Sequence, residues 1–117
     1  MPQFLLLLRN EGHEDWSAAD LQSVLKRYGT WSDGLRDAGK MAGGNKLRDR
    51  EGKVLRRNGK GVTVMDGPFA ESKEVLGGYF VVNADSYDDA VKLTKDCPHF
   101  EFGSIEVRQI EEMRPPA

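Results

Sequence analysis

The sequence has one cysteine, no apolar stretch longer than five residues and no excess of charge of either sign. The single cysteine, Cys97, excludes an internal disulfide and a multi-cysteine metal site, as is usual in a reducing compartment. The longest apolar run, Phe4 to Leu8, is too short to cross a bilayer or to form a signal-peptide core. Seventeen basic and 19 acidic residues leave a formal charge of −2, which favours neither nucleic acid nor an anionic membrane as partner. We therefore expect a cytoplasmic protein with no membrane partner.

What the chain does contain is 117 residues with 13 glycines, a larger share of glycine than the usual value of about 7%. A folded chain of this size hides about two thirds of the surface that it exposes when unfolded, which is enough for one modest core. We expect a single domain over residues 1–112 and a C-terminal tail over 113–117.

The hydrophobic pattern predicts the order of the secondary-structure elements. Continuous or alternating apolar residues predict strands, a spacing of three and four predicts helices, and Asn58-Gly59 is typical of a tight hairpin turn. In chain order we expect a strand at 4–8, a helix at 17–39, a strand at 41–47, a hairpin at 54–65, a single helical turn at 70–75, a strand at 79–82, a helix from Ser86 to before Pro98, and a strand at 104–110. This order predicts an α+β fold of the ferredoxin-like βαββαβ type with an inserted β-hairpin.

One face of each helix is expected to cover the sheet. The first helix offers Leu21, Val24, Leu25, Tyr28, Trp31, Leu35 and Ala38, and the second offers Tyr87, Ala90, Val91 and Thr94. Tyr28 and Trp31 either line a cavity between helix and sheet or fill the core.

The strands at 4–8 and 79–82 are apolar on both faces, although two helices can cover only one face of the sheet. The economical cover for the other face is a second copy of the chain, packed sheet to sheet in a symmetric dimer, because no further segment is left to supply it. The sequence therefore predicts a homodimer.

The segment from Asp66 to Glu74, Asp-Gly-Pro-Phe-Ala-Glu-Ser-Lys-Glu, is followed by Leu-Gly-Gly-Tyr-Phe at 76–80. It resembles the hallmark of the DGPF branch of the YCII-related family, and the resemblance extends from the first strand through Cys97-Pro98 to the closing strand. It implies a dimeric α+β barrel and a bacterial protein of the kind found beside or fused to sigma factors of the extracytoplasmic-function type. The resemblance names no reaction, so it leaves open whether the chain is an enzyme.

Asp66 is the first candidate for a catalytic role. It ends a predicted strand before a Gly-Pro turn, where the exposed amides of the turn favour a negative group. Asp66 would act as a general base or orient a ligand, with Glu71 and Lys73 tuning it or anchoring an acid. The alternative is that Asp66 caps the turn and Phe69 fills the core. The residues predicted to bind a small molecule are Arg9, Trp31, Gly67, Phe69, Glu71 and Lys73.

His13 is the second candidate, in the loop after the first strand. Beside Glu11 and Glu14 it could act as an acid–base group or help to hold a metal. No second histidine stands at ligand spacing, so an exposed loop histidine is the simpler interpretation, and we predict no metal and no cofactor. The helix at 17–39 lacks the histidine that the shorter branch of the family carries, which weakens a His–Asp dyad by analogy. His99 is expected on the surface and Cys97 in the core.

Residues 46–60 hold seven cations, offset by two acidic residues, and could follow a phosphate backbone. The segment has no interleaved aromatic residue on which a base could stack, and cations on a hairpin also protect sheet edges from aggregation. Three functions therefore remain open: a small-molecule enzyme that uses Asp66, a non-catalytic sensor or partner-binding module linked to sigma-factor regulation, and, as the least favoured, nucleic-acid binding.

Overall fold

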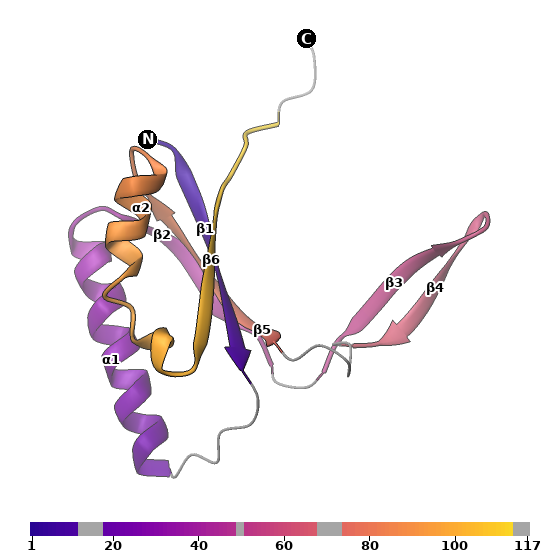
Figure 1. The fold of residues 1–117 in the computed structure, drawn as a ribbon, viewed down its shortest axis with the longest axis horizontal. Helices are drawn as coiled ribbons and strands as arrows, with labels where there is room; N and C mark the ends of the chain where they lie inside the picture. Colours follow the sequence, from indigo (N-terminus) through magenta and orange to yellow (C-terminus); the bar gives the residue numbers. More distant parts are fainter. Residues whose placement is uncertain (12–17, 49–50, 68–73, 114–117) are drawn as a thin grey trace.

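The computed structural model describes residues 1–11, 18–48, 51–67 and 74–113 (Figure 1). Its elements, in chain order, are β1 (Gln3–Glu11), α1 (Ala18–Asp37), β2 (Met41–Lys46), β3 (Lys53–Asn58), β4 (Gly61–Asp66), β5 (Glu74–Asn83), α2 (Tyr87–Thr94), a 3₁₀ helix η1 (Pro98–Glu101) and β6 (Gly103–Gln109). Within the described residues, no helix is both long enough and apolar enough to cross a membrane.

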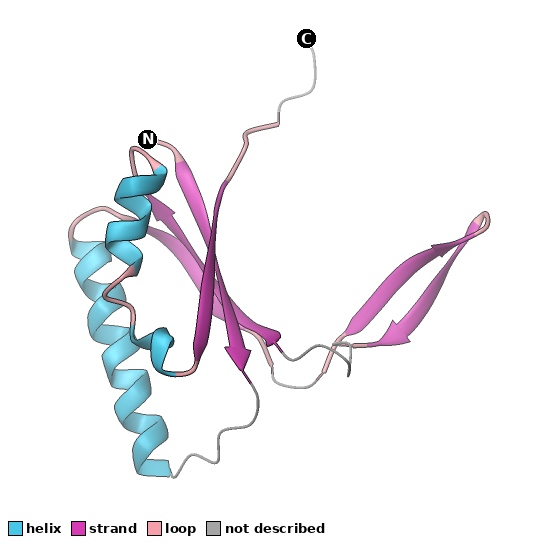
Figure 2. Ribbon diagram, viewed as in Figure 1, coloured by secondary structure: helices cyan, strands magenta, loops and turns pink. Residues whose placement is uncertain are grey.

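Four strands form one antiparallel sheet in the order β2-β5-β1-β6. The two α-helices lie together on one face of this sheet (Figure 2). This connectivity, with β3 and β4 inserted between β2 and β5, confirms the predicted ferredoxin-like α+β fold with an extra hairpin.

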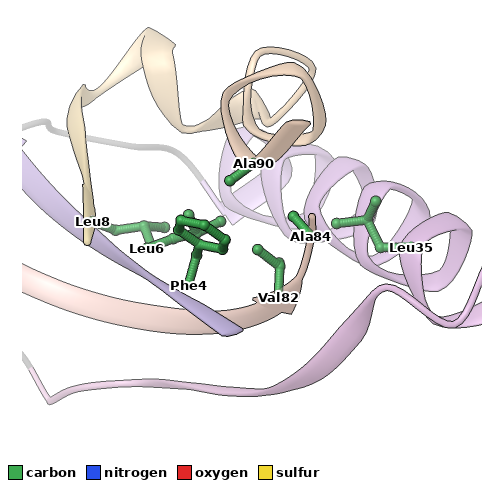
Figure 3. Close-up of a cluster of buried hydrophobic side chains, with 7 residues drawn as sticks. All are labelled: Phe4, Leu6, Leu8, Leu35, Val82, Ala84 and Ala90. Carbon is green, nitrogen blue, oxygen red and sulfur yellow. The ribbon is translucent and has the colours of Figure 1, made fainter. Parts of the chain in front are cut away.

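The core lies between the central strands and the helices. Phe4 and Leu6 of β1 and Val82 of β5 are fully buried there. Figure 3 shows their side chains against the rest of the cluster, which consists of Leu8, Leu35, Ala84 and Ala90. Alternate residues of a strand point to opposite faces, so one half of the continuous apolar run in β1 supplies this core.

The other half of that run lies on the face of the sheet that the helices leave uncovered. Leu5 pairs with Val81 of β5, and Leu7 pairs with Tyr79. All four side chains are half-buried. We call this surface, defined by Leu5, Leu7, Tyr79 and Val81, the open face.

The helix faces follow the predicted pattern only in part. In α1, Val24 and Leu35 are buried and Tyr28 and Trp31 pack on the core, but Leu25 is 53% exposed.

In α2, Ser86 accepts the expected hydrogen bond from the Asp89 amide, and Ala90 and Thr94 are buried. Tyr87 also faces the sheet, because its ring meets the Phe4 ring edge-on with centroids 4.9 Å apart, although the residue is 47% exposed. The inclusion of Val91 in the inner face was wrong, because Val91 is exposed and Leu93 packs on the core instead. Val91 is turned about 100° around the helix from Ala90, away from the sheet.

Gly77 occupies a β-bulge between β1 and β5. Leu8 pairs with Gly78 and Arg9 with Leu76, so Gly77 has no partner position. A Cβ at Gly77 would lie 2.4 Å from Asn10 Nδ2, so a larger residue here would require the Asn10 side chain to move. Residues 74 and 75 belong to β5, which contradicts the last two residues of the expected helical turn, while residues 70–73 lie outside the described part of the chain.

The inserted hairpin is a separate two-stranded sheet, which we call the arm (Lys53–Asp66). Its turn has Gly59 at a φ of 62°, as the Asn58-Gly59 pair predicted. The arm projects from the rest of the molecule on the side away from α1 (Figure 1). The molecule is consequently broad and thin, with extents of 51 × 48 × 18 Å.

Candidate functional site

Asp66 is the last residue of the arm and pairs with Lys53 at its base. The Lys53 ammonium donates a hydrogen bond to Asp66 Oδ1, and the two side chains are 66% and 89% exposed. Next to them, the Gly67 amide donates to the Gly52 carbonyl at 2.9 Å and closes the base of the arm. An exposed ion pair of this kind adds at most about 1 kcal/mol to stability, so the carboxylate is accessible to a ligand and contributes little to the fold.

Arg9 lies at the edge of the open face. Its Nη2 is 3.4 Å from Glu106 Oε1, and Arg108 Nη1 is 3.3 Å from Glu106 Oε2. Two guanidinium groups therefore share one carboxylate, which leaves a net positive charge beside Leu7. The planar guanidinium group of Arg9 is suited to bind a carboxylate or phosphate group. At the other edge, Asn45 Nδ2 donates to Tyr79 Oη at 2.9 Å. The open face thus combines an apolar centre with polar groups at both edges.

Trp31 lies in the core, between α1 and the sheet. Its Nε1 donates to the Leu93 carbonyl at 3.1 Å, and its ring meets Phe80 edge-on with centroids 5.1 Å apart. Asp66 is on the arm, on the far side of the sheet in Figure 1. A single chain therefore does not bring Trp31 and Asp66 together.

Four of the predicted site residues, His13, Phe69, Glu71 and Lys73, lie outside the described residues. The side chains of Glu11 and Glu14, which would join His13 at a metal, lie outside them as well. Elsewhere in the described chain, no three His, Cys, Asp or Glu side chains are close enough together to hold a metal ion. The predicted residues that the structure describes thus fall into three places: Asp66 and Gly67 on the arm, Arg9 at the open face and Trp31 in the core.

A buried polar cluster surrounds His99, which was wrongly expected on the surface and is only 2% exposed. The 3₁₀ helix η1 turns this residue inward between α1 and β1. His99 Nε2 lies 2.9 Å from the Arg9 carbonyl, which can only accept, so Nε2 carries the proton. His99 Nδ1 then accepts from the Tyr28 hydroxyl at 2.7 Å.

Burial keeps the groups of this cluster uncharged. It lowers the pKa of His99, and it raises the pKa of the Cys97 thiol to about 11. Burial, followed by the proximity of Cys97, raises the pKa of Tyr28 above its ordinary range. A protonated thiol and a histidine with both nitrogens engaged are poor nucleophiles and bases, so the cluster attaches η1 to α1 and β1. Sequence spacing could not reveal it, because Tyr28 and His99 are 71 residues apart.

Comparisons with known proteins identify the family. An uncharacterised protein of Rhizobium meliloti (strain 1021) is 31% identical over 103 residues, which cover 86% of this chain and 83% of that protein. The solved structure of 5-chloro-2-hydroxyhydroquinone dehydrochlorinase from Burkholderia phenoliruptrix AC1100, in complex with 2,5-dihydroxybenzoquinone, aligns with a TM-score of 0.49 and 15% identity over 95% of each chain. The family model of the YCII-related domain matches residues 3–114. The chain therefore belongs to the YCII-related domain family, as its resemblance at residues 66–80 indicated.

Proposed function

We propose that the chain is a homodimeric small-molecule-binding protein whose ligand lies beside Asp66, with the Asp66 carboxylate as acid–base group. The observation that carries the proposal is the Asp66–Lys53 pair, in which a highly exposed carboxylate is oriented by one ammonium group. A ligand can reach this carboxylate without disturbing the core of the chain.

The pair has the components of general acid–base catalysis. Asp66 as a carboxylate takes a proton from an acidic O–H or C–H group of the ligand, and as an acid it returns the proton to the product. The Lys53 ammonium stabilises the negative charge that develops on the ligand after the proton has left. Arg9, with its fork of donors at the open face, is suited to hold an anionic part of the ligand.

The open face supports the homodimer. Its four apolar side chains lie side by side across the two central strands, and the helices cover only the opposite face. A contiguous apolar patch on a soluble protein is typical of an interface. A second copy of the chain can cover this patch in a two-fold dimer, in which each copy meets the other through the same surfaces.

Replacing Asp66 tests the proposed role. A thermal-shift screen with cell metabolites first identifies a ligand by the rise in Tm that binding to the folded state produces. We expect Asp66→Asn to weaken binding of that ligand at least tenfold, because a charge-assisted hydrogen bond to the carboxylate is lost. Where there is turnover, we expect it to be abolished, because Asn cannot exchange the proton. The free energy of unfolding should change by less than about 1 kcal/mol.

Asp33→Asn is the matched control. Asp33 is also an exposed aspartate in an ion pair, with Arg36 of α1, and α1 lies on the other side of the four-stranded sheet from the arm (Figure 1). The control should bind as the wild type does. An Asp66→Asn variant with full binding and full turnover would remove Asp66 from the mechanism.

A non-catalytic sensor or partner-binding module linked to sigma-factor regulation is the second candidate. It is favoured by the exposed aliphatic side chains Leu55, Val62 and Val64 on the arm, which a folded partner could cover. In that case the metabolite screen finds no ligand, or a ligand that the protein binds without converting it. Asp66→Asn then changes neither the binding of a ligand nor the binding of the partner.

A further inference from the structure

We infer that the arm of each copy packs one of its faces on the open face of a second copy, so that the ligand site beside Asp66 is complete only in the dimer. The inference rests on the proposed homodimer and specifies its contact: the arm of the second copy, rather than its open face, covers the open face. It also explains how a carboxylate that is 89% exposed in one chain acquires the enclosed setting that binding requires.

The pairing of β3 with β4 sorts the side chains of the arm into two faces. Lys53 stands opposite Asp66, Leu55 opposite Val64 and Arg57 opposite Val62. Two residues that stand directly opposite each other in a strand pair point to the same face of the sheet. Residues two positions apart along one strand also share a face. Leu55, Val62 and Val64 therefore lie on one face together with Arg57 and the Lys53–Asp66 pair. We call it the aliphatic face.

The aliphatic face is exposed in the single chain. Leu55, Val62 and Val64 are 62%, 63% and 58% exposed. Among the described strands, β3 and β4 pair with each other and with no strand of the four-stranded sheet. A two-stranded hairpin is marginally stable in water without a hydrophobic surface to pack on. The arm therefore needs a cover that its own sheet does not supply.

The chain exposes more surface than a compact chain of its mass, and the excess is as large as the area that a protein interface buries. The chain exposes 8781 Å², against about 6,400 Å² for a compact chain of this mass. The excess is about 2,400 Å², whereas a standard interface buries about 800 Å² per partner and an obligate dimer about 1,000–2,500 Å². A small ligand could cover only a fraction of this excess, while a second chain could cover most of it.

Charge and chemistry favour a second copy as that partner. The arm carries a net charge of +3 within a total of −2, so the rest of the chain carries −5 and attracts it. The open face offers the apolar centre that Leu55, Val62 and Val64 require. A nucleic acid would offer phosphates to the three aliphatic side chains, and the arm has no aromatic residue for its bases.

Docking changes the surroundings of the proposed site. The Lys53–Asp66 pair lies at the base of the arm on the aliphatic face, so it comes to the border of the contact with the second copy. Water is excluded from one side of the pair, where the charge that develops on a bound ligand is stabilised more strongly than in bulk solvent.

Photo-crosslinking tests this contact in the full chain. The photoreactive amino acid p-benzoylphenylalanine replaces Val64, and an equimolar mixture of unlabelled and ¹⁵N-labelled chains is irradiated and analysed by peptide mass spectrometry. We expect crosslinks that join labelled to unlabelled chains and end in residues 3–9 or 76–83. The matched control places the same group at Thr63, on the opposite face of the arm, where we expect at least tenfold less of this product.

Several crosslinking results would contradict the contact between the arm and the open face of a second copy. Crosslinks within one chain, equal yields from positions 63 and 64, or crosslinks to nucleic acid or to another protein would each contradict it. If light scattering still shows a dimer in any of these cases, the homodimer and the role of Asp66 stand and only the docking of the arm is wrong.

Variants give an independent readout. The double substitution Leu55→Lys and Val64→Lys should raise the dimer dissociation constant at least a hundredfold, whereas Thr63→Lys should change it less than threefold. Circular dichroism confirms that the four-stranded sheet and its helices are retained. A double variant that dimerises like the wild type would overturn the inference.

Discussion

At the scale of single residues, His99 depends most on its surroundings. Tyr28 from α1 and the Arg9 carbonyl from β1 engage its two ring nitrogens, and Arg27 and Glu101 form an ion pair next to it between α1 and η1. A neutral imidazole satisfies both hydrogen bonds, since one nitrogen donates and the other accepts. An imidazolium would present two donors and would lose the hydrogen bond that it accepts from Tyr28.

This arrangement predicts a pH-dependent stability. Because burial lowers the pKa of His99 in the folded protein, the unfolded chain binds the proton first as the pH falls. The stabilisation is complete above the unfolded pKa of about 6.5 and declines below it, by at most about 1.4 kcal/mol per pH unit.

Urea denaturation between pH 5 and 7.5 measures this contribution when wild type is compared with His99→Gln. The wild type should lose stability more steeply than the variant as the pH falls below about 6.5. Parallel curves for the two proteins would show that His99 is not the group whose protonation destabilises the fold. His13 is present in both proteins, so it does not account for a difference between the two curves.

At the scale of elements, β6 enters the sheet through a close backbone approach. A Cβ at Gly103 would lie only 1.9 Å from the Arg9 carbonyl oxygen, an atom that cannot rotate away as a side chain can. Gly34, in contrast, sits on an exposed part of α1, where a Cβ would meet nothing within 4 Å.

The same substitution at these two glycines should therefore have opposite effects. Gly103→Ala should lower the free energy of unfolding by about 2–3 kcal/mol, because β1 and β6 must separate to admit the methyl group. Gly34→Ala should raise it by about 0.5–1 kcal/mol, since alanine loses less backbone entropy in a helix. Chemical denaturation measures both values. A Gly103→Ala variant with the wild-type free energy of unfolding would mean that β1 and β6 approach less closely than in the structure.

The elements were predictable because each carries a local signal. The apolar run of β1, the Asn58-Gly59 turn and the Ser86 cap depend on neighbouring residues, and the structure has all three. The burial of His99 and the exposure of Leu25 depend on which elements meet in space. Such contacts form between residues far apart in the sequence, so a local pattern does not contain them.

The candidate site illustrates the same limit. The sequence pointed to Asp66 by its position before a Gly-Pro turn, and the structure places it at the end of β4 beside Lys53. The sequence also grouped Asp66 with Trp31, which the fold separates. A hairpin pattern predicts that two strands pair with each other, but not the surface on which the pair packs.

At the scale of the whole molecule, the thin shape, the open face and the projecting arm all describe a chain that lacks part of its cover. One copy buries the helix side of its sheet well, with Phe4, Leu6 and Val82 fully enclosed. The opposite side and the aliphatic face of the arm remain available. A dimer in which each copy covers these surfaces of the other accounts for both with the same chain.

A homodimer is therefore expected in solution, and the molar mass of the full chain measures it. Light scattering at micromolar concentration should give twice the chain mass of 13.1 kDa for the wild type. It should give the single-chain mass for a folded Leu7→Lys variant, which places a charge in the middle of the open face. A wild-type mass of 13.1 kDa, or a Leu7→Lys variant that remains a dimer, would contradict the account.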